Sequence, residues 1–486
     1  MSIVSWYFPF YIILFFGAYF IAPKKYRWCI ILATSILFYA WRNLTGFVIA
    51  LLTALFTYLI ALAMNRNQEN ERGDRNRTLF IASTVIIIAW WLLLKFGSRN
   101  TDLGLIVPLG ISFYSLNNIA YLNNVSRKKY PAEKNFLHYF TYILYFPQIT
   151  QGPFTSYPQM RKQLLEGHDF SAERFSEGCI RSLYGLTVKK LIIANQLSLI
   201  VNGILGSYED NTGSTLFVVM ILYSIQLYAD FSGYMDIVNG ISHVIGIEMP
   251  ENFQRPYFSS SLDEFWRRWH ITLGAWFREY VFFPISMNKR VQKIGKAARK
   301  RFGNKTGKLL AGDIALFFVW TATGLWHDFT LLYLIWGYLN MLVIVASLHL
   351  DGFYKTIREK LKISDENKIY SLFRMARTFI LVCLIRVPAV SKDLHMMTGI
   401  YQKIFSAGNV ADLFGETGPI TLFLLAASVL SMLVIDVLCE RKKWQDVRKN
   451  CPMLLKDIAV ALMVVFFILF VGKDNDLLGG FMYARF

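Results

Sequence analysis

The sequence predicts an all-α, polytopic integral membrane protein, and two observations carry that prediction. Hydrophobic residues make up 55% of the 486-residue chain, charged residues make up 17%, and the mean hydropathy is +0.37. Apolar segments of roughly 18 to 22 residues, long enough to cross the hydrocarbon core as helices, recur along the chain. A membrane β-barrel would instead alternate apolar and polar residues in short segments, and the sequence lacks that pattern.

We expect apolar helices over residues 3–22, 28–41, 46–64, 79–97, 105–122, 137–150, 180–204, 215–246, 310–326, 330–350, 373–392, 418–439 and 456–472. The first should be a retained span rather than a signal peptide, because it lacks a basic leading region and a small-residue cleavage site. Segments 28–41 and 137–150 are too short to cross alone and should be half-spans or re-entrant. We treat residues 1–486 as a single membrane-embedded domain, with N-terminal spans over 1–100, a motif-bearing region over 101–350 and C-terminal spans over 351–486.

Two stretches combine proline, glycine and polar residues where a plain span should not. They read VPLGISFY over 107–114 and FPQITQGP over 146–153. Proline removes a backbone donor and disfavours helix in the residue before it, so both stretches should interrupt their helices. Interrupted helices inside a membrane usually line a cavity. We therefore predict a bundle with broken or re-entrant helices around a central cavity, with simple interfacial loops as the alternative.

The net charge of +18 is concentrated in short basic loops between the apolar segments. The densest block, residues 288–301, has no acidic residue and is followed by Lys305 and Lys308. Basic loops of this kind mark the cytoplasmic side, so we expect this block to face the cytoplasm and touch anionic lipid. An acidic partner or substrate is the alternative ligand for it, and nucleic acid is not indicated.

The cysteines argue against a disulfide framework, a zinc site or a redox centre. Their number is odd, they are scattered, and none forms a CxxC pair. We interpret them as small apolar packing residues: Cys29, Cys179, Cys383, Cys439 and Cys451.

The stretch 262–285 has aromatic side chains at helical spacing from Trp266 to Tyr280, with charged residues on the other positions. Asp263 and Glu264 would lie in the first turn, where the helix dipole favours acidic side chains. We expect one amphipathic helix in the cytoplasmic membrane interface. On these grounds alone His270 is an interfacial residue.

His327 is the first candidate for a functional group. It lies in the largely apolar run 309–350, which is about long enough for two spans, and its one evident charged neighbour is Asp328. An ionisable side chain in that setting indicates a functional site. A structural histidine hydrogen-bonded between packed helices is the alternative, and the residues alone leave both open.

Several motifs, taken in order, resemble those of the membrane-bound O-acyltransferases, and most closely the bacterial branch that includes alginate O-acetylation. The paired signatures are WRRWHITL at 266–273, continuing to WFREY at 276–280, and GLWH at 324–327. Further agreement comes from PLGISFY at 108–114, DFSGYMD at 230–236, PENFQRPY at 250–257 and FMYARF at 481–486. The resemblance runs over nearly the whole chain, and a neighbouring branch of the family transfers D-alanine.

This resemblance implies a membrane acyltransferase that moves an acyl group, most simply acetyl, from a cytoplasmic thioester donor to a hydroxyl of an exported polysaccharide or other cell-envelope glycan. Transfer would be direct or would pass through a separate extracytoplasmic acyltransferase partner. The resemblance implies no tightly bound cofactor and no metal. The expected donor is acetyl-CoA, with a phosphopantetheine carrier protein as the alternative. The expected location is the bacterial cytoplasmic (inner) membrane, crossed several times and in contact with membrane lipid.

The resemblance gives His327 the catalytic role and His270 a second functional role. A neutral imidazole can take the proton of a hydroxyl, which is a poor nucleophile until then, and burial favours the neutral form. Trp326 and Asn340 are candidate donors to an oxyanion. We expect the site to be shaped by Trp326, Asp328, Arg267, Trp269, Gln151, Asp230 and Asn340.

Two positions depart from the family pattern and leave the acceptor open. Asp328 stands where the family often has glycine, and Gln151 stands where a small residue is more usual. D-alanyl transfer from a carrier-protein thioester toward teichoic acid is therefore a second hypothesis, which the chain length favours less. A third is a polysaccharide exporter or flippase without chemistry, for which internal repeats and mid-membrane charges are expected. The sequence has no visible repeat.

Overall fold

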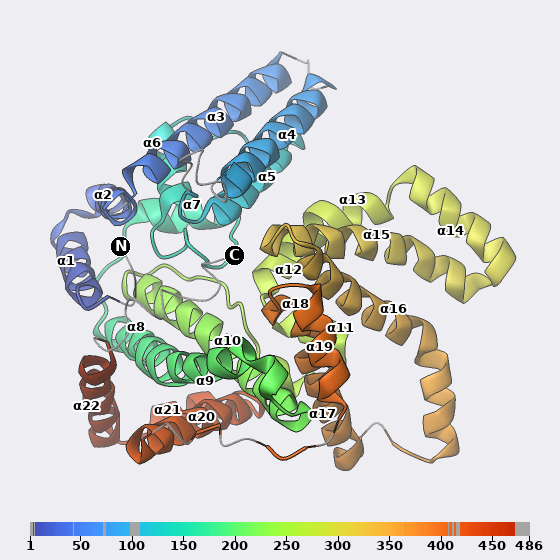
Figure 1. Cartoon of the computed structure of the whole chain (residues 1–486). Helices are drawn as coiled ribbons and strands as arrows, with labels where there is room; N and C mark the ends of the chain where they lie inside the picture. Colours follow the sequence, from blue (N-terminus) through green and yellow to red (C-terminus); the bar gives the residue numbers. More distant parts are fainter. Residues whose placement is uncertain are drawn as a thin grey trace. The chain divides into compact units, whose positions relative to one another are not determined.

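The computed structural model describes residues 3, 5–41, 43–70, 74–97, 107–364, 366–406, 408–410, 413–414 and 418–471. Within these ranges the regular structure is helical, and the one β-type pairing is an isolated bridge between Phe253 and Trp269 (Figure 1). Eight of the described helices are long and apolar enough to cross a membrane. The predicted all-α, polytopic membrane fold is therefore confirmed. The C-terminal motif at 481–486 lies outside the described residues.

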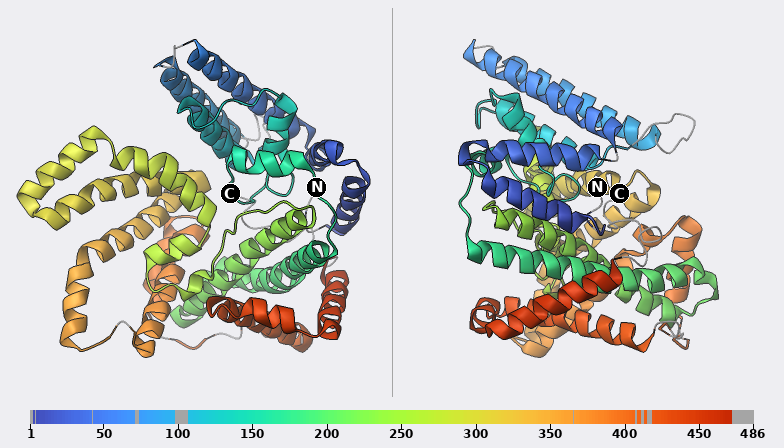
Figure 2. Two further views of the ribbon diagram at one scale, coloured as in Figure 1. Left: turned by 180° about the vertical axis from the view of Figure 1, so that it is seen from behind. Right: turned by 90° about the vertical axis from the view of Figure 1, so that its left-hand side faces the viewer.

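The chain forms two compact units. Figure 2 shows the ribbon of the chain from two further sides. The first contains residues 1–187, 233–250 and 460–485, and the second contains residues 188–232, 251–459 and 486. Helix α10 (Gly213–Val244) contributes its earlier part to the second unit and its end to the first. Both candidate histidines belong to the second unit.

The first unit is mainly an N-terminal series of helices. They are α1 (Phe8–Ile21), α2 (Arg27–Ala40), α3 (Leu44–Glu69), α4 (Asp74–Gly97), α5 (Ile111–Ser126), α6 (Phe136–Leu144), α7 (Tyr157–Glu166) and α8 (Ala172–Leu183). Helices α3 and α4 are long enough to cross a membrane, whereas α2 and α6 have 14 and 9 residues. The two segments predicted to be too short to cross alone are therefore short helices. Helix α1, with 14 residues, is also shorter than the predicted span 3–22.

Both predicted interruptions in the first unit are present. Helix α5 begins directly after Gly110, and no regular helix joins Leu144, the end of α6, to Tyr157, the start of α7. Gly110 has a φ of 71°, and a Cβ built on it would lie 1.9 Å from the carbonyl oxygen of Ile149. Glycine is required there because it tolerates this backbone conformation and leaves room for the second interrupted stretch.

A buried carboxylate holds the connection between α5 and α6 in place. Glu133 accepts hydrogen bonds from the Tyr157 hydroxyl at 2.6 Å, from Arg161 at 2.5 Å and from the backbone N–H of Asn135. Burial by itself raises the pKa of Glu133, but these hydrogen bonds and the Arg161 charge outweigh it and lower the pKa to about 2. The carboxylate is therefore ionised at neutral pH.

The second unit begins in a π-helical stretch, Tyr184–Ala194, that leads into α9 (Asn195–Gly206). Its later elements are α11 (Leu262–Arg268), α12 (Ile271–Phe277), α13 (Phe283–Ser286), α14 (Lys289–Phe302), α15 (Asn304–His327), α16 (Leu331–Lys360), α17 (Lys368–Ile385), α18 (Val387–Val390), α19 (Leu394–Ile404), α20 (Pro419–Glu440) and α21 (Trp444–Asn450). Helix α22 (Met453–Phe470) is shared with the first unit. Among these, α15, α16, α20 and α22 meet the length and hydropathy of a span.

The single segment predicted over 373–392 is wrong. Helix α17 ends at Ile385, and the short helix α18 starts at Val387 with Pro388 in its first turn. Proline cannot donate to the preceding turn and restricts the residue before it, so the helix is interrupted here. The interruption leaves Arg386 at the junction of the two helices.

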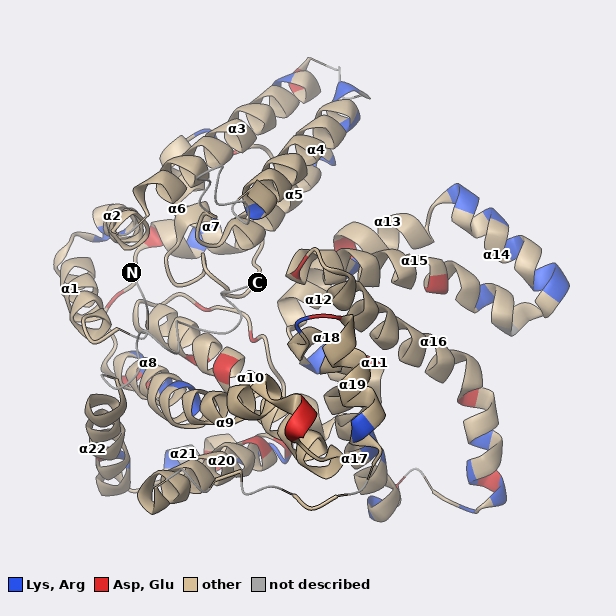
Figure 3. Ribbon diagram, viewed as in Figure 1, with Lys and Arg blue, Asp and Glu red and all other residues tan. Residues whose placement is uncertain are grey.

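The basic block predicted from the sequence forms helix α14, which is rich in lysine and arginine residues (Figure 3). Gly295 and Ala298 are its buried residues. A Cβ on Gly295 would lie 3.2 Å from the carbonyl oxygen of Gly307, so small residues let α14 and α15 approach closely. The cytoplasmic side and the lipid contact of this helix stay predictions.

Candidate active site

His270 lies at a break in what the sequence predicted as one amphipathic helix. Helix α11 ends at Arg268, and α12 begins at Ile271. Between them Trp269 is extended, and His270 has a left-handed backbone with φ 48° and ψ 51°. The prediction of one continuous helix over this stretch is therefore wrong.

The cause of the break is a backbone pairing between two sequence motifs. Phe253 forms an antiparallel bridge with Trp269. Around it the N–H of Gln254 donates to Arg268 at 2.9 Å, and the N–H of Ile271 donates to Asn252 at 3.1 Å. These bonds use backbone groups that a continuous helix would have paired internally. The pairing turns His270 into the interior of the unit.

The His270 imidazole is enclosed rather than interfacial, with 2% of the residue exposed. Its ring centroid lies 4.8 Å from that of Phe231 and 6.2 Å from that of Trp326. Burial holds the pKa of His270 well below its usual range, and the charge interaction with His327 lowers it further. His270 is therefore neutral at pH 7, and its ring and that of His327 both lie near Trp326.

His327 is the last residue of α15 and is 4% exposed. Its ring centroid lies 4.9 Å from that of Trp326, 5.2 Å from Trp336 and 5.9 Å from Tyr333, on which it stacks. Trp336 and Tyr333 belong to α16, so the imidazole is held between the two helices. Aromatic walls of this kind lower the local polarity and strengthen electrostatic interactions inside them.

Two glycines allow α15 and α16 to come close enough to enclose His327. A Cβ on Gly324 would lie 2.7 Å from the carbonyl oxygen of Tyr333. A Cβ on Gly337 would lie 2.7 Å from the carbonyl oxygen of Trp320. Any side chain at either position would push the helices apart and open the enclosure.

Asn340 joins this helix pair to α11. Its Oδ1 accepts a hydrogen bond from Trp266 Nε1 at 2.9 Å, and its Nδ2 donates to the carbonyl of Trp336 at 2.8 Å. The Trp266 ring also packs against Trp320 and Trp336, at 5.0 and 5.6 Å. Because the amide already bonds at both ends, Asn340 acts here as a link that positions Trp266.

The remaining candidates lie in different surroundings. Trp269 is fully buried, and Asp230 forms a buried ion pair with Lys190 at 2.6 Å. Asp328 is half-buried and accepts from the N–H of Phe329 at 2.9 Å. Arg267 is exposed and pairs with Asp263, so it points away from the buried histidines.

Gln151 belongs to the first unit, whereas the other candidates belong to the second unit. Its side chain is completely buried. Neither end of its amide has a hydrogen-bond partner among the described residues. Buried amides are usually bonded to protein or ordered water, which makes Gln151 a polar position worth mutating.

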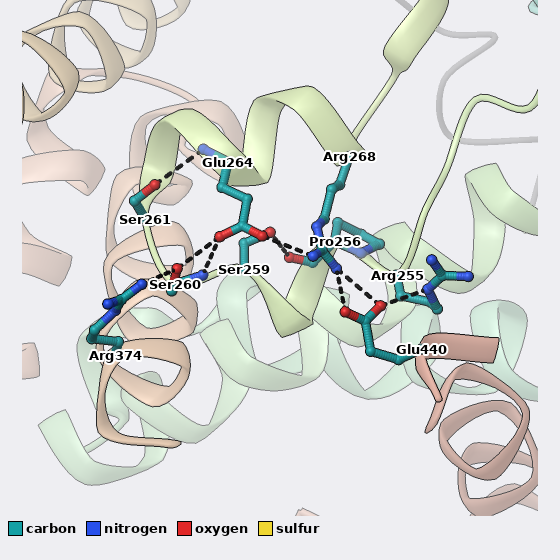
Figure 4. A network of polar contacts seen from close by, with 9 residues as sticks. All are labelled: Arg255, Pro256, Ser259, Ser260, Ser261, Glu264, Arg268, Arg374 and Glu440. Carbon is teal, nitrogen blue, oxygen red and sulfur yellow. Dashed lines mark hydrogen bonds and ion pairs between the residues drawn. The ribbon is translucent and has the colours of Figure 1, made fainter. Parts of the chain in front are cut away.

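An ionic network holds α11 and the loop that precedes it (Figure 4). Glu264 pairs with Arg268 at 2.8 Å, and Arg268 also pairs with Glu440 of α20 at 3.1 Å. Glu440 in turn pairs with Arg255 at 2.8 Å. The carboxylate of Glu264 also accepts from Ser260, which ties the helix start to the preceding loop. The network fixes both ends of the segment that presents His270.

Sequence reasoning did not identify several residues around the histidines. They are Phe231, Tyr333 and Trp336, which pack on the imidazoles, Lys190, which pairs with Asp230, and Arg386, which stacks on Trp269. Phe231 lies inside the motif DFSGYMD at 230–236. The others carry no local pattern, because tertiary packing brings them to the site.

The chain is similar to several known proteins. Residues 34–297, slightly more than half of the chain, match the profile of the membrane-bound O-acyltransferase family, a range that includes His270. A protein named probable alginate O-acetylase from Pseudomonas syringae is 28% identical over 410 residues, which cover 82% of this chain and 73% of that protein. The peptidoglycan O-acetyltransferase of Helicobacter pylori is 26% identical over 341 residues, 63% of this chain and 61% of that protein. The teichoic acid D-alanyltransferase of Bacillus subtilis is 27% identical over 294 residues, 57% of this chain and 67% of that protein.

Proposed function

The chain belongs to the membrane-bound O-acyltransferase family, and from this premise we propose that it transfers acetyl groups to hydroxyls of an exported polysaccharide or another cell-envelope glycan. Relatives named for O-acetylation of alginate and of peptidoglycan support this class of acceptor. The observation that carries the mechanism is the pair of buried histidines, His270 and His327, whose rings both pack against Trp326.

In the proposed reaction His327 is the general base. The acceptor hydroxyl oxygen attacks the thioester carbonyl carbon while the imidazole takes the hydroxyl proton. The tetrahedral intermediate then collapses, the carbon–sulfur bond breaks, and the imidazolium returns the proton to the departing thiolate. The products are an ester and a free thiol, and His327 is neutral again. The aromatic walls keep out water that would otherwise hydrolyse the thioester.

We assign His270 a different part in the same step. Its depressed pKa keeps it neutral, so it has one N–H to donate and adds no charge of its own. A neutral donor aimed at the developing oxyanion stabilises the tetrahedral intermediate. His270 would thus bind the carbonyl oxygen while His327 handles the proton.

The donor in this proposal is acetyl-CoA, which reaches the site from the cytoplasm. The protein would lie in the bacterial cytoplasmic membrane, and its acceptor would be the glycan itself or an extracytoplasmic acyltransferase partner. The similarity to a teichoic acid D-alanyltransferase supports a second candidate, in which a carrier-protein thioester donates D-alanine. Membership of an acyltransferase family argues against the hypothesis of an exporter without chemistry.

The test is the ester content of envelope glycan in cells that lack the native protein. The deletion strain would be complemented by wild type, by H327A or by H395A at equal membrane levels. His395 is a control of the same residue type in the same unit, exposed and paired with Glu209. We expect H395A to restore O-acetyl content and H327A to lose it by about 100-fold or more, since general-base catalysis contributes on the order of 10²–10⁴.

Full acetylation in the H327A strain would refute the catalytic assignment. An unchanged acetyl content in the deletion strain, together with a fall in ester-linked D-alanine, would replace the acetyl proposal by the D-alanyl one.

A further inference from the structure

A buried arginine beside the histidine site has a charge that the described chain does not neutralise. Arg386, at the junction of α17 and α18, is 6% exposed. No carboxylate in the described part of the chain lies within 4.0 Å of its guanidinium. The buried Lys190 of the same unit, by contrast, pairs with Asp230 at 2.6 Å. Among the described residues of the unit, Arg386 thus differs from the other buried cation, which has a carboxylate partner.

Aromatic rings surround the Arg386 guanidinium. Its central carbon lies 4.7 Å from the ring centroid of Trp269 and 5.9 Å from those of Tyr257 and Phe265. Nη1 donates a hydrogen bond to the Tyr257 hydroxyl at 2.9 Å, the single side-chain hydrogen bond of Arg386 within the described residues. Ring faces attract a cation but take none of its N–H donors. A guanidinium has five N–H groups, so most of its donor capacity is unused.

The unused donors of Arg386 are also not sealed inside protein. The enclosed side-chain atoms that lack a partner, among the described residues, do not include any nitrogen of Arg386. A desolvated charge is costly unless an opposite charge and hydrogen bonds compensate it. The planar fork of a guanidinium matches the paired oxygens of a phosphate or carboxylate, which would supply both. This chemistry points to an oxyanion as the missing partner.

The position of the arginine connects that oxyanion with the reaction site. Arg386 stacks on Trp269, and the next residue in the chain is His270. All three belong to the second unit. An anion on the free edge of the guanidinium would thus be held beside the strained His270 turn. A coenzyme A or phosphopantetheine donor carries phosphate groups, and an acidic glycan acceptor carries carboxylates.

We propose that Arg386 is a substrate-binding residue, whose free guanidinium edge takes a phosphate or carboxylate carried by the acyl donor or the glycan acceptor. This inference rests on the proposed acyl transfer for the identity of the ligand. The arginine binds and orients its ligand and takes no part in proton transfer.

The test is equilibrium binding of two probes to the purified full-length protein in lipid nanodiscs, measured by calorimetry. Coenzyme A presents phosphates, and galacturonate presents the carboxylate of an acidic sugar. We expect R386M to weaken one probe by about 10- to 100-fold, the range of a lost charge-assisted bidentate contact, and R386K to lie between R386M and wild type. K189M is the matched control, because Lys189 is a half-buried cation over the Tyr228 ring in the same unit, and it should bind both probes as wild type does.

Each outcome decides one part of the proposal. Loss of coenzyme A binding assigns the anion to the donor, and loss of galacturonate binding assigns it to the acceptor. Wild-type affinity of R386M for both probes overturns the proposal and makes Arg386 a packing residue. If R386M does not accumulate, the wild-type protein is treated with phenylglyoxal, and modification of Arg386 is followed by peptide mass spectrometry. Protection by either probe supports the anion site, and equal modification with and without both probes refutes it.

The same measurements separate this inference from the proposed function. H327A should bind coenzyme A normally while transferring no acetyl, because binding does not need the base. Arg386-dependent binding without any acetyl transfer in cells would leave the anion site standing and remove the acetyl proposal. If the wild-type protein transfers acetyl in cells but R386M binds both probes normally, the acetyl proposal stands and the anion site is removed.

Discussion

Lys190 and Arg386, the two buried cations among the described residues of the second unit, have opposite surroundings. Lys190 projects from a π-helical stretch onto Asp230, and both side chains are almost fully buried. Arg386 projects from the end of a proline-interrupted helix into a group of aromatic rings, with one hydroxyl as its hydrogen-bond partner among the described residues. The first cation is neutralised by the protein, and the second is left for something else to neutralise. The difference separates a charge that holds the fold together from a charge that is available for binding.

The largest effect should come from breaking the paired cation. D230N removes the carboxylate charge that lies 2.6 Å from the buried Lys190, and we expect the unfolding free energy to fall by about 3–5 kcal/mol, the usual result of removing one partner of a buried pair. Thermal unfolding in detergent measures this directly. The double variant D230L/K190M removes both charges and should recover most of the loss. A D230N protein as stable as wild type would contradict the assignment of this pair as structural.

Glu133, a buried anion of the first unit, tests whether a buried acidic side chain is also stabilised by its partners. The pKa of Glu133 is about 2 in the folded protein, below its ordinary value of 4.5. A depressed acid pKa contributes stability that is complete above about pH 4.5 and is lost as the pH falls from 4.5 toward 2. We expect E133Q to be about 2–3 kcal/mol less stable than wild type at pH 7, because the hydrogen bonds to the carboxylate weaken.

The pH dependence of E133Q provides the check on this second prediction. Its melting temperature should change less than that of wild type between pH 4.5 and pH 2, because it has no carboxylate to protonate there. Parallel pH curves for the two proteins would show that Glu133 is not the group responsible.

Removing the unpaired cation should cost the fold much less than breaking the paired one. R386M loses one hydrogen bond and the attraction of the rings, but it also relieves a desolvated charge, so we expect stability within about 1 kcal/mol of wild type. Thermal unfolding under the conditions used for D230N makes the two changes comparable. A loss of the size seen for D230N would show that Arg386 holds the aromatic group together. Arg386 would then be a structural charge like Lys190.

The smallest effect should come from Arg267, which the sequence predicted to shape the site. Arg267 and Asp263 form an exposed ion pair one helical turn apart, and such pairs contribute about 0.3–0.5 kcal/mol. We expect the unfolding free energy of R267A to differ from that of wild type by no more than this amount. The variant should support full O-acetylation in cells. Strongly reduced acetylation at normal protein levels would return Arg267 to the active site.

The sequence was informative where function depends on local pattern. Apolar segment length predicted the membrane fold, and proline with glycine predicted the interruptions near Gly110 and Ile149, since both act through the backbone of their own segment. The family motifs predicted a functional role for His270 and His327, which stays a prediction. Local pattern failed at Trp269, where the aromatic spacing predicted a continuous helix and the pairing with Phe253 replaced it.

By itself the sequence therefore determined the class of protein and its family, and it predicted a functional role for His270 and His327. Tertiary structure decided which polar side chains became enclosed and which were neutralised. Lys190 lies 40 residues from Asp230, and Arg386 lies 129 residues from Tyr257. The energy of a charge depends on its neighbours in space and on its distance from water, and neither quantity is written in the spacing of residues along the chain.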